Sequence, residues 1–136
     1  MTKIDDFFIV DRAKNPRFKG TIGQYTCMAS GSNAFCGDSL TVELFLDHSS
    51  PAIVVSDATY DGFACSLCIA SADVLCEKII GKGLGFISSI SLDDVLLWLG
   101  GLEAGVTRKK CILLPLELIK EATETEGEQR NDRYLE

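Results

Sequence analysis

The chain has 136 residues, 46% of them hydrophobic, which is enough to bury the core of one domain and excludes intrinsic disorder. A formal net charge of −7 leaves no basic face for nucleic acid, so we expect no nucleic-acid partner. No apolar run approaches the roughly 20 residues of a bilayer-spanning helix, so we expect no membrane association.

The N-terminal segment, residues 1–12, mixes acidic and aromatic residues. It has neither the apolar stretch nor the small-residue cleavage site of a secretory signal, so we expect a cytoplasmic, reducing location. In such a compartment, the six cysteines are more often metal ligands, catalytic thiols or core residues than disulfide partners.

The first half of the chain predicts strands. Pro16 and Gly20 mark a turn or loop after the N-terminal segment. Weak β character covers residues 25–29, and the runs 40–46 and 52–60 are rich in β-branched and apolar residues, as is typical of strands. Because only a polar turn segment separates the two strong runs, we expect them to pair as an antiparallel hairpin.

The second half predicts helices. After Gly62 the apolar residues recur with a period of 3.6, and Asp73 is expected to point away from the apolar face. A capped start predicts a short helix within residues 91–99. A last helix is expected after the basic segment 108–110, with Pro115 tolerated only in its first turn. The apolar face of the first helix is predicted to carry Cys65, Cys68, Ile69, Ala72, Leu75, Cys76 and Ile79.

Three strands followed by helices, without βαβ alternation, predict an α+β fold with a three-stranded antiparallel sheet and helices packed on it. We expect one domain over residues 1–122. The polar, acidic residues 123–136 are expected to form a C-terminal tail.

Three cysteines lie at predicted junctions between elements. Cys36 precedes a strand and stands two residues before Asp38, as a metal half-site or a small buried residue would. Cys65 begins the first helix, where unpaired N–H groups favour a thiolate. Cys111 follows three cations, which also favour a thiolate, and is expected to open the last helix. For each of these cysteines, both a ligand role and a core role are open.

The other cysteines are interpreted as structural. Cys68 and Cys76 lie on the apolar helix face and Cys27 on the weak strand. The spacing from Cys65 to Cys68 matches a thioredoxin-like redox motif, but no βαβ unit surrounds it, which argues against that role. His48 is expected to be solvated in the hairpin turn. Three thiolates and one carboxylate from distant loops could bind zinc or an iron–sulfur cluster on a preformed surface.

Several short segments together resemble the U-type iron–sulfur scaffold family, which comprises IscU, SufU and the N-terminal domain of NifU. They occur in the family's order and spacing between about residue 15 and residue 122, and the motifs are most similar to the NifU-like branch. The segments are Asn15-Pro16-Arg17 with Gly20, Asn33-x-x-Cys36-Gly37-Asp38, Gly62-x-x-Cys65, Ala70-Ser71-Ala72 and Arg108-Lys109-Lys110-Cys111.

The resemblance implies a SufE/NifU-like fold in which Cys36, Cys65 and Cys111 meet at one end with Asp38 beside them. It implies a scaffold that accepts sulfur from a cysteine desulfurase, builds a [2Fe–2S] cluster from iron and sulfur, and passes it to apo-protein acceptors. The three cysteines would be ligands, Asp38 would keep the cluster labile, and Cys111 is our preferred first sulfur acceptor. Family members are monomers or weak homodimers.

The resemblance also implies an alternative function, a zinc-dependent sulfurtransferase of the SufU type that would hold Zn²⁺ with the same four residues. Two departures from the family pattern are notable. Asp73 stands where many members have serine, and Lys110 stands where the IscU branch has a histidine. A lysine is a poor metal ligand at neutral pH, so the expected site depends on thiolates and Asp38.

Overall fold

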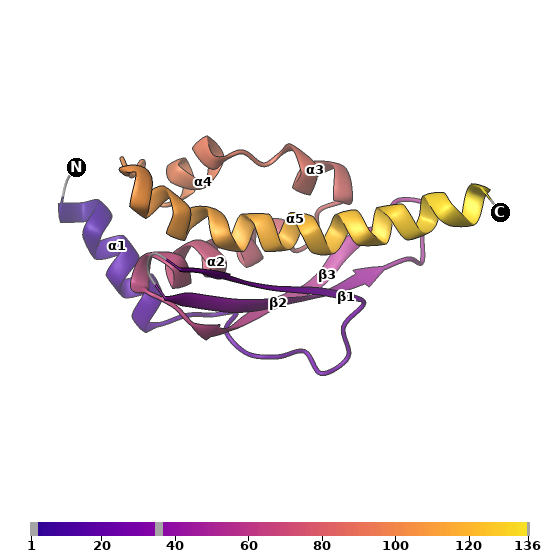
Figure 1. Ribbon diagram of the computed structural model, residues 1–136, viewed down its shortest axis with the longest axis horizontal. Coiled ribbons are helices and arrows are strands. Elements are labelled where there is room, and N and C mark those ends of the chain that lie inside the picture. The colour runs from indigo at the N-terminus through magenta and orange to yellow at the C-terminus, as the bar shows by residue number, and fades with distance from the viewer. Residues whose placement is uncertain (1–2, 35–36, 136) are drawn as a thin grey trace.

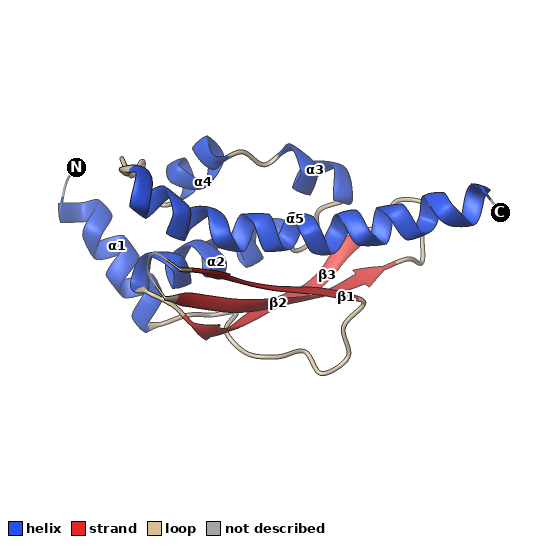
Figure 2. Ribbon diagram, viewed as in Figure 1, coloured by secondary structure: helices blue, strands red, loops and turns tan. Residues whose placement is uncertain are grey.

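A three-stranded sheet forms the base of this computed structural model, and two helices, α2 and α5, pack against it (Figures 1 and 2). The backbone is described for residues 3–34 and 37–135, and the side chains for residues 7–34 and 37–124. The elements of this part are α1 (Lys3–Lys14), β1 (Cys27–Asn33), β2 (Asp38–Asp47), β3 (Val54–Phe63), α2 (Ser66–Ile79), α3 (Leu84–Ser89), α4 (Leu92–Trp98) and α5 (Val106–Leu135).

The strands are ordered β1-β2-β3 and both pairs are antiparallel, which confirms the predicted hairpin and the predicted α+β fold class. In β2 every second residue from Asp38 to Leu46 is buried, because one face of the sheet lies beneath the helices. Helix α5 packs on β1, α2 packs on both β3 and α5, and α1 packs on α2. Figure 1 shows α1 and the first turns of α5 at the same end of the sheet.

Gly62 allows the end of β3 to approach the start of β2. It pairs with Leu40 and has a φ of 137°, a conformation that disfavours other residues. A Cβ atom at this position would lie 2.0 Å from the backbone oxygen of Ser39. Gly62 therefore fixes the spacing of the two strands next to Asp38 and Cys65.

Helix α5 corrects the prediction for the C-terminal part of the chain. It begins at Val106, so Arg108 and Lys109 lie in its first turn, and Lys110 and Cys111 lie in the second turn, so that Cys111 does not open the helix. Pro115 is inside the helix rather than in its first turn. Proline cannot donate to the carbonyl of Cys111. The helix nevertheless continues, because both neighbours of Pro115 are buried against the core.

The same helix extends to Leu135, where we expected a tail from residue 123. The division of the chain into a domain over 1–122 and a C-terminal segment remains a prediction. Helices α1 and α3 were not predicted from the sequence. Among the described helices, none combines the length and the apolar character needed to cross a bilayer.

Asp73 is completely buried, which corrects the expectation that it points away from the core. Its carboxylate accepts hydrogen bonds from the backbone N–H groups of Arg17 and Phe18 at 3.0 and 2.9 Å. It also accepts from the Tyr60 hydroxyl at 3.0 Å and from Nε of Arg12 at 2.6 Å. Asp73 thus joins α1, the segment after it, β3 and α2.

Burial, reinforced by the charge of Asp73, also affects two neighbours of this carboxylate. It raises the pKa of Tyr60 and the pKa of Cys76. Both side chains therefore stay protonated at neutral pH. For Cys76, 1% exposed, this agrees with its predicted role as a core residue.

The close approach at Gly62 predicts a large cost for Gly62→Ala. Backbone strain and the clash with Ser39 together should lower the free energy of unfolding by about 2–4 kcal/mol. Gly20→Ala is the matched control, because Gly20 has a similar φ of 147° but nothing within 4 Å of the added Cβ. Urea denaturation of both variants measures the difference, and equal losses would contradict a steric role for Gly62.

The contacts of Asp73 predict that Arg12→Ala destabilises the fold. Removing the guanidinium leaves a buried carboxylate without its charged partner, which should cost about 3 kcal/mol. Arg17→Ala is the control. The Arg17 side chain is 67% exposed and its ion pair with Glu77 is long, at 3.7 Å, so this substitution should lower the free energy of unfolding by less than about 1 kcal/mol. If thermal or urea unfolding showed that the two substitutions lower the free energy of unfolding by similar amounts, the Asp73 contacts would not hold α1 in place.

Candidate metal centre

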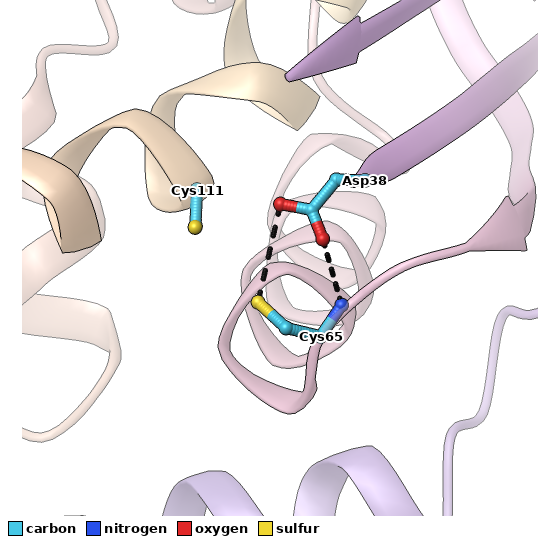
Figure 3. A group of neighbouring side chains, drawn as sticks. All are labelled: Asp38, Cys65 and Cys111. Carbon is cyan, nitrogen blue, oxygen red and sulfur yellow. Dashed lines mark hydrogen bonds between the residues drawn. The ribbon is translucent and has the colours of Figure 1, made fainter. Parts of the chain in front are cut away.

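Asp38, Cys65 and Cys111 meet at one end of the sheet (Figure 3). One ligand atom from each residue lies within 4.8 Å of the others. Asp38 begins β2, Cys65 directly precedes α2, and Cys111 lies in the second turn of α5. Three elements distant in sequence thus bring two sulfur atoms and a carboxylate together.

Cys36, the third expected thiol ligand, lies outside the described residues. Its neighbour Gly37 has a φ of 71°, and the N–H of Gly37 donates to the carbonyl of Asn33 at 2.9 Å. β1 ends at Asn33 and β2 begins at Asp38, so Cys36 belongs to the four residues between these strands in the sequence. The ligand role of Cys36 remains a prediction.

Asp38 is buried, with 1% of its surface exposed, so its carboxylate depends on internal partners. Oδ1 accepts the backbone N–H of Cys65 at 2.8 Å. Oδ2 lies 3.9 Å from the Cys65 sulfur. One oxygen thus anchors the start of α2 while the other faces the thiol.

Cys65 is the N-cap residue of α2, as its position after the second strong strand predicts. Its backbone is extended, and its sulfur accepts the N–H of Cys68 at 3.4 Å. A cap normally uses an oxygen acceptor, and here a sulfur takes that place. Cys65 is half-buried, and the contact with the Cys68 N–H holds its sulfur at the helix end.

Cys111 is nearly inaccessible, with an exposed fraction of 3%. Its sulfur accepts a hydrogen bond from Nδ2 of Asn33 at 3.6 Å. The cations before it, Arg108, Lys109 and Lys110, are exposed in the first two turns of α5. The helix-start argument for Cys111 was therefore wrong, because the dipole effect falls off beyond the first turn.

Ser71 fixes the position of α5 beside α2. Its buried hydroxyl donates to the carbonyl of Ile112 at 2.9 Å, one residue after Cys111. This contact gives a physical role to a serine that the sequence analysis recorded only as part of a motif. This hydrogen bond holds the part of α5 that carries Cys111 against α2, the helix that begins at Cys65.

The remaining candidates from the sequence lie apart from this group. Cys68 and Cys76 are buried in the core, and Cys27 is half-buried against it, in agreement with their predicted structural roles. His48 is exposed in the turn between β2 and β3. Sequence reasoning gave no role to Asn33, although it opens the Asn33-x-x-Cys36-Gly37-Asp38 motif.

The donor set suits a thiophilic metal. Two cysteine sulfurs and one carboxylate oxygen are ligand types found in zinc sites and at iron–sulfur clusters. The supporting elements are packed and hydrogen-bonded in the chain alone, so binding does not need to create the fold.

Comparison with known proteins agrees with this geometry. Residues 6–131 match the sequence model described as the NifU-like N-terminal domain. The chain is 29% identical over 130 residues to the iron–sulfur cluster assembly scaffold protein IscU of Thermotoga maritima, covering 84% of this chain and 88% of that one. It is 34% identical over 83 residues to the zinc-dependent sulfurtransferase SufU of Bacillus subtilis, covering 61% of this chain and about half, 53%, of that one.

Solved structures show the same fold. The N-terminal part of a NifU-like protein from Brucella abortus superposes with a TM-score of 0.75 at 19% identity, covering 93% of this chain and 99% of that one. A protein proposed as an iron–sulfur cluster assembly scaffold for the SUF system of Fervidobacterium islandicum AW-1 gives a TM-score of 0.66 at 25% identity, covering 85% and 93%.

The Asp38 anchor predicts different effects for two substitutions. Asp38→Ala leaves the Cys65 N–H without its acceptor and should lower the free energy of unfolding of the metal-free protein by about 1–3 kcal/mol. Asp38→Asn keeps an acceptor oxygen and the side-chain shape and should cost less than about 1 kcal/mol. Glu103→Ala, at an exposed loop position, is the control for loss of an acidic side chain. Urea titrations that gave equal losses for both Asp38 variants would show that charge, not the hydrogen bond, anchors α2.

Proposed function

Since the chain belongs to the NifU-like N-terminal domain family, whose IscU and SufU members act in iron–sulfur cluster assembly, we propose that it is a scaffold that builds a [2Fe–2S] cluster and transfers it to apo-proteins. The proposal depends on one observation, the convergence of Asp38, Cys65 and Cys111 within 4.8 Å. Iron, persulfide sulfur and the two electrons that reduce each of these sulfurs to sulfide are the substrates in this function, and the cluster is the product that leaves.

The proposed ligands are Cys36, Cys65 and Cys111, with Asp38 as the fourth. A carboxylate oxygen is a harder ligand than a thiolate and a poorer match for iron–sulfur chemistry. A site with three thiolates and one carboxylate therefore holds the cluster less firmly than four thiolates would. Such a site suits a protein that must release what it assembles.

The charges near Cys111 favour an anionic group at this site. Three exposed cations lie in the first two turns of α5 immediately before Cys111, near the helix end that already has a positive partial charge. Cations at this position are unfavourable for the isolated helix. A nearby anionic group, such as a cluster bound by several thiolates, would offset that cost.

Sulfur is proposed to come from a cysteine desulfurase as a persulfide. The acceptor thiolate attacks the outer sulfur, the S–S bond of the donor breaks, and the donor cysteine leaves as a thiolate, so no external oxidant is needed. Cys111 is the proposed first acceptor, on the basis of its neighbouring cations. Because Cys111 is only 3% exposed, its side chain must turn outward for this step.

A zinc-dependent sulfurtransferase is the second candidate function. It is favoured by the 34% identity to the Bacillus subtilis protein that carries this name. Three thiolates and a carboxylate would give Zn²⁺ a four-coordinate site. In this function one thiolate would leave the metal to accept sulfur and then pass it on.

Anaerobic reconstitution tests the scaffold function. The protein is incubated with ferrous iron, L-cysteine, a thiol reductant and a cysteine desulfurase, and visible absorption and transfer to an apo-ferredoxin are measured. Cys36→Ser, Cys65→Ser and Cys111→Ser should each lose most of the absorption, because a hydroxyl is a poor substitute for a thiolate. Cys27→Ser, which changes a half-buried cysteine outside the site, is the control and should retain it.

Two results would contradict the scaffold proposal. A triple variant with serine at positions 36, 65 and 111 that still assembled a cluster would refute the ligand assignment. Tightly bound stoichiometric zinc, stimulation of the desulfurase and no cluster transfer would establish the sulfurtransferase function instead.

A further inference from the structure

We propose that Asn33 is a positioning residue of this site, and that it holds the Cys111 thiol in place as Asp38 holds Cys65. The ligand role of Cys111 belongs to the proposed function. The restraint by Asn33 belongs to the metal-free chain and can be tested without any metal.

The position of Asn33 follows from the sheet register. It is the last residue of β1 and pairs directly with Asp38, the first residue of β2. Its carbonyl accepts the N–H of Gly37, the residue before Asp38. Asn33 and Asp38 therefore lie opposite each other where β1 ends and β2 begins, and we call them the base residues.

Each base residue holds one of the two distant cysteines. Asp38 accepts the Cys65 N–H at 2.8 Å, and Asn33 donates an amide N–H to the Cys111 sulfur at 3.6 Å. Both base residues are buried, with 1% and 9% of their surfaces exposed, so these contacts form away from bulk water. A single pair of residues across two strands thus ties α2 and α5 to the same end of the sheet.

Asn33 also faces a hollow on the outside of the site. The hollow has a volume of about 440 Å³ and is lined by Ser32, Asn33, Ala34, Lys110, Leu113, Leu114 and Glu117. Asn33 therefore contacts both the buried sulfur and this open space.

The Asn33 amide and the Cys111 sulfur form a hydrogen bond with a defined donor and acceptor. An amide N–H is a donor and a cysteine sulfur is an acceptor, so the bond restrains the Cys111 side chain towards Asp38 and Cys65. Sulfur transfer to Cys111 requires an outward turn, which breaks this bond. Asn33 therefore acts through Cys111 and does not itself need to touch metal or substrate.

The test is competitive alkylation of the metal-free protein. Wild type and Asn33→Leu, which keeps a similar volume and removes the donor, are treated anaerobically with substoichiometric iodoacetamide. Peptide mass spectrometry then gives the labelling of Cys111 relative to Cys65. Loss of the bond should raise this ratio about fivefold, the effect of roughly 1 kcal/mol at 1.4 kcal/mol per tenfold. Ser32→Ala, which changes an exposed neighbour that lines the same hollow, should leave the ratio unchanged.

A ratio within about twofold of wild type in a folded Asn33→Leu protein would overturn the proposal. Cys68 and Cys76, 0% and 1% exposed, report folding because they are labelled only when the core opens. If they are labelled in Asn33→Leu, the ratio of Cys111 to Cys65 labelling is measured in the smaller, polar Asn33→Ser instead. A ratio within about twofold of wild type in that variant would likewise overturn the proposal.

Zinc affinity of the same variants, measured by competition with a chromophoric chelator, provides a second readout. Asn33→Leu should bind about fivefold more weakly than wild type or Ser32→Ala. Equal affinity would show that Asn33 does not organise the ligand set. Failure of the wild type to bind zinc or iron would contradict the proposed function and would leave the alkylation result standing.

Discussion

The site depends on the buried carboxylate of Asp38. A carboxylate that is 1% exposed requires internal hydrogen bonds, and Asp38 finds one on the backbone N–H of Cys65, 27 residues later in the chain. This contact joins the first residue of β2 to the N-cap of α2. It is possible because Gly62 lets β3 approach β2 more closely than any side chain would permit. Asp38, Gly62 and Cys65 therefore form one structural unit.

A second buried carboxylate, Asp73, fixes the other side of the same helix. Asp38 holds the start of α2 against the sheet, and Asp73 holds the middle of α2 against α1 and the segment that follows it. Ser71 then ties α2 to α5 through the carbonyl of Ile112. With α2 fixed at these points, packed elements hold the two sulfur atoms and the Asp38 carboxylate within 4.8 Å of one another, so that the site is formed before its cargo arrives.

The sequence predicts the parts of this structure that local patterns determine. The strand hairpin, the position of Cys65 at a helix start and the core roles of Cys68 and Cys76 follow from periodicity and junctions. The burial of Asp73 does not, because its partners come from α1 and from β3, far away in sequence. Likewise, the start of α5 before its cations and its continuation past Pro115 depend on packing against the sheet and α2. Asn33 has no local signal at all, since its contact with Cys111 spans 78 residues.

The two oxygens of Asp38 have different partners, and this difference connects stability with the proposed function. Oδ1 accepts the Cys65 N–H, while Oδ2 faces the Cys65 sulfur. In the proposed scaffold, Oδ2 can bind and release iron while Oδ1 keeps its hydrogen bond, so loss of the weakest ligand does not loosen the start of α2. The thiolates differ in a parallel way, because Cys65 is half-exposed at a helix end whereas Cys111 is buried behind Asn33. A cluster at this site could therefore detach first at the carboxylate and at the half-buried Cys65, while the hydrogen bond from the Cys65 N–H to Asp38 stays in place.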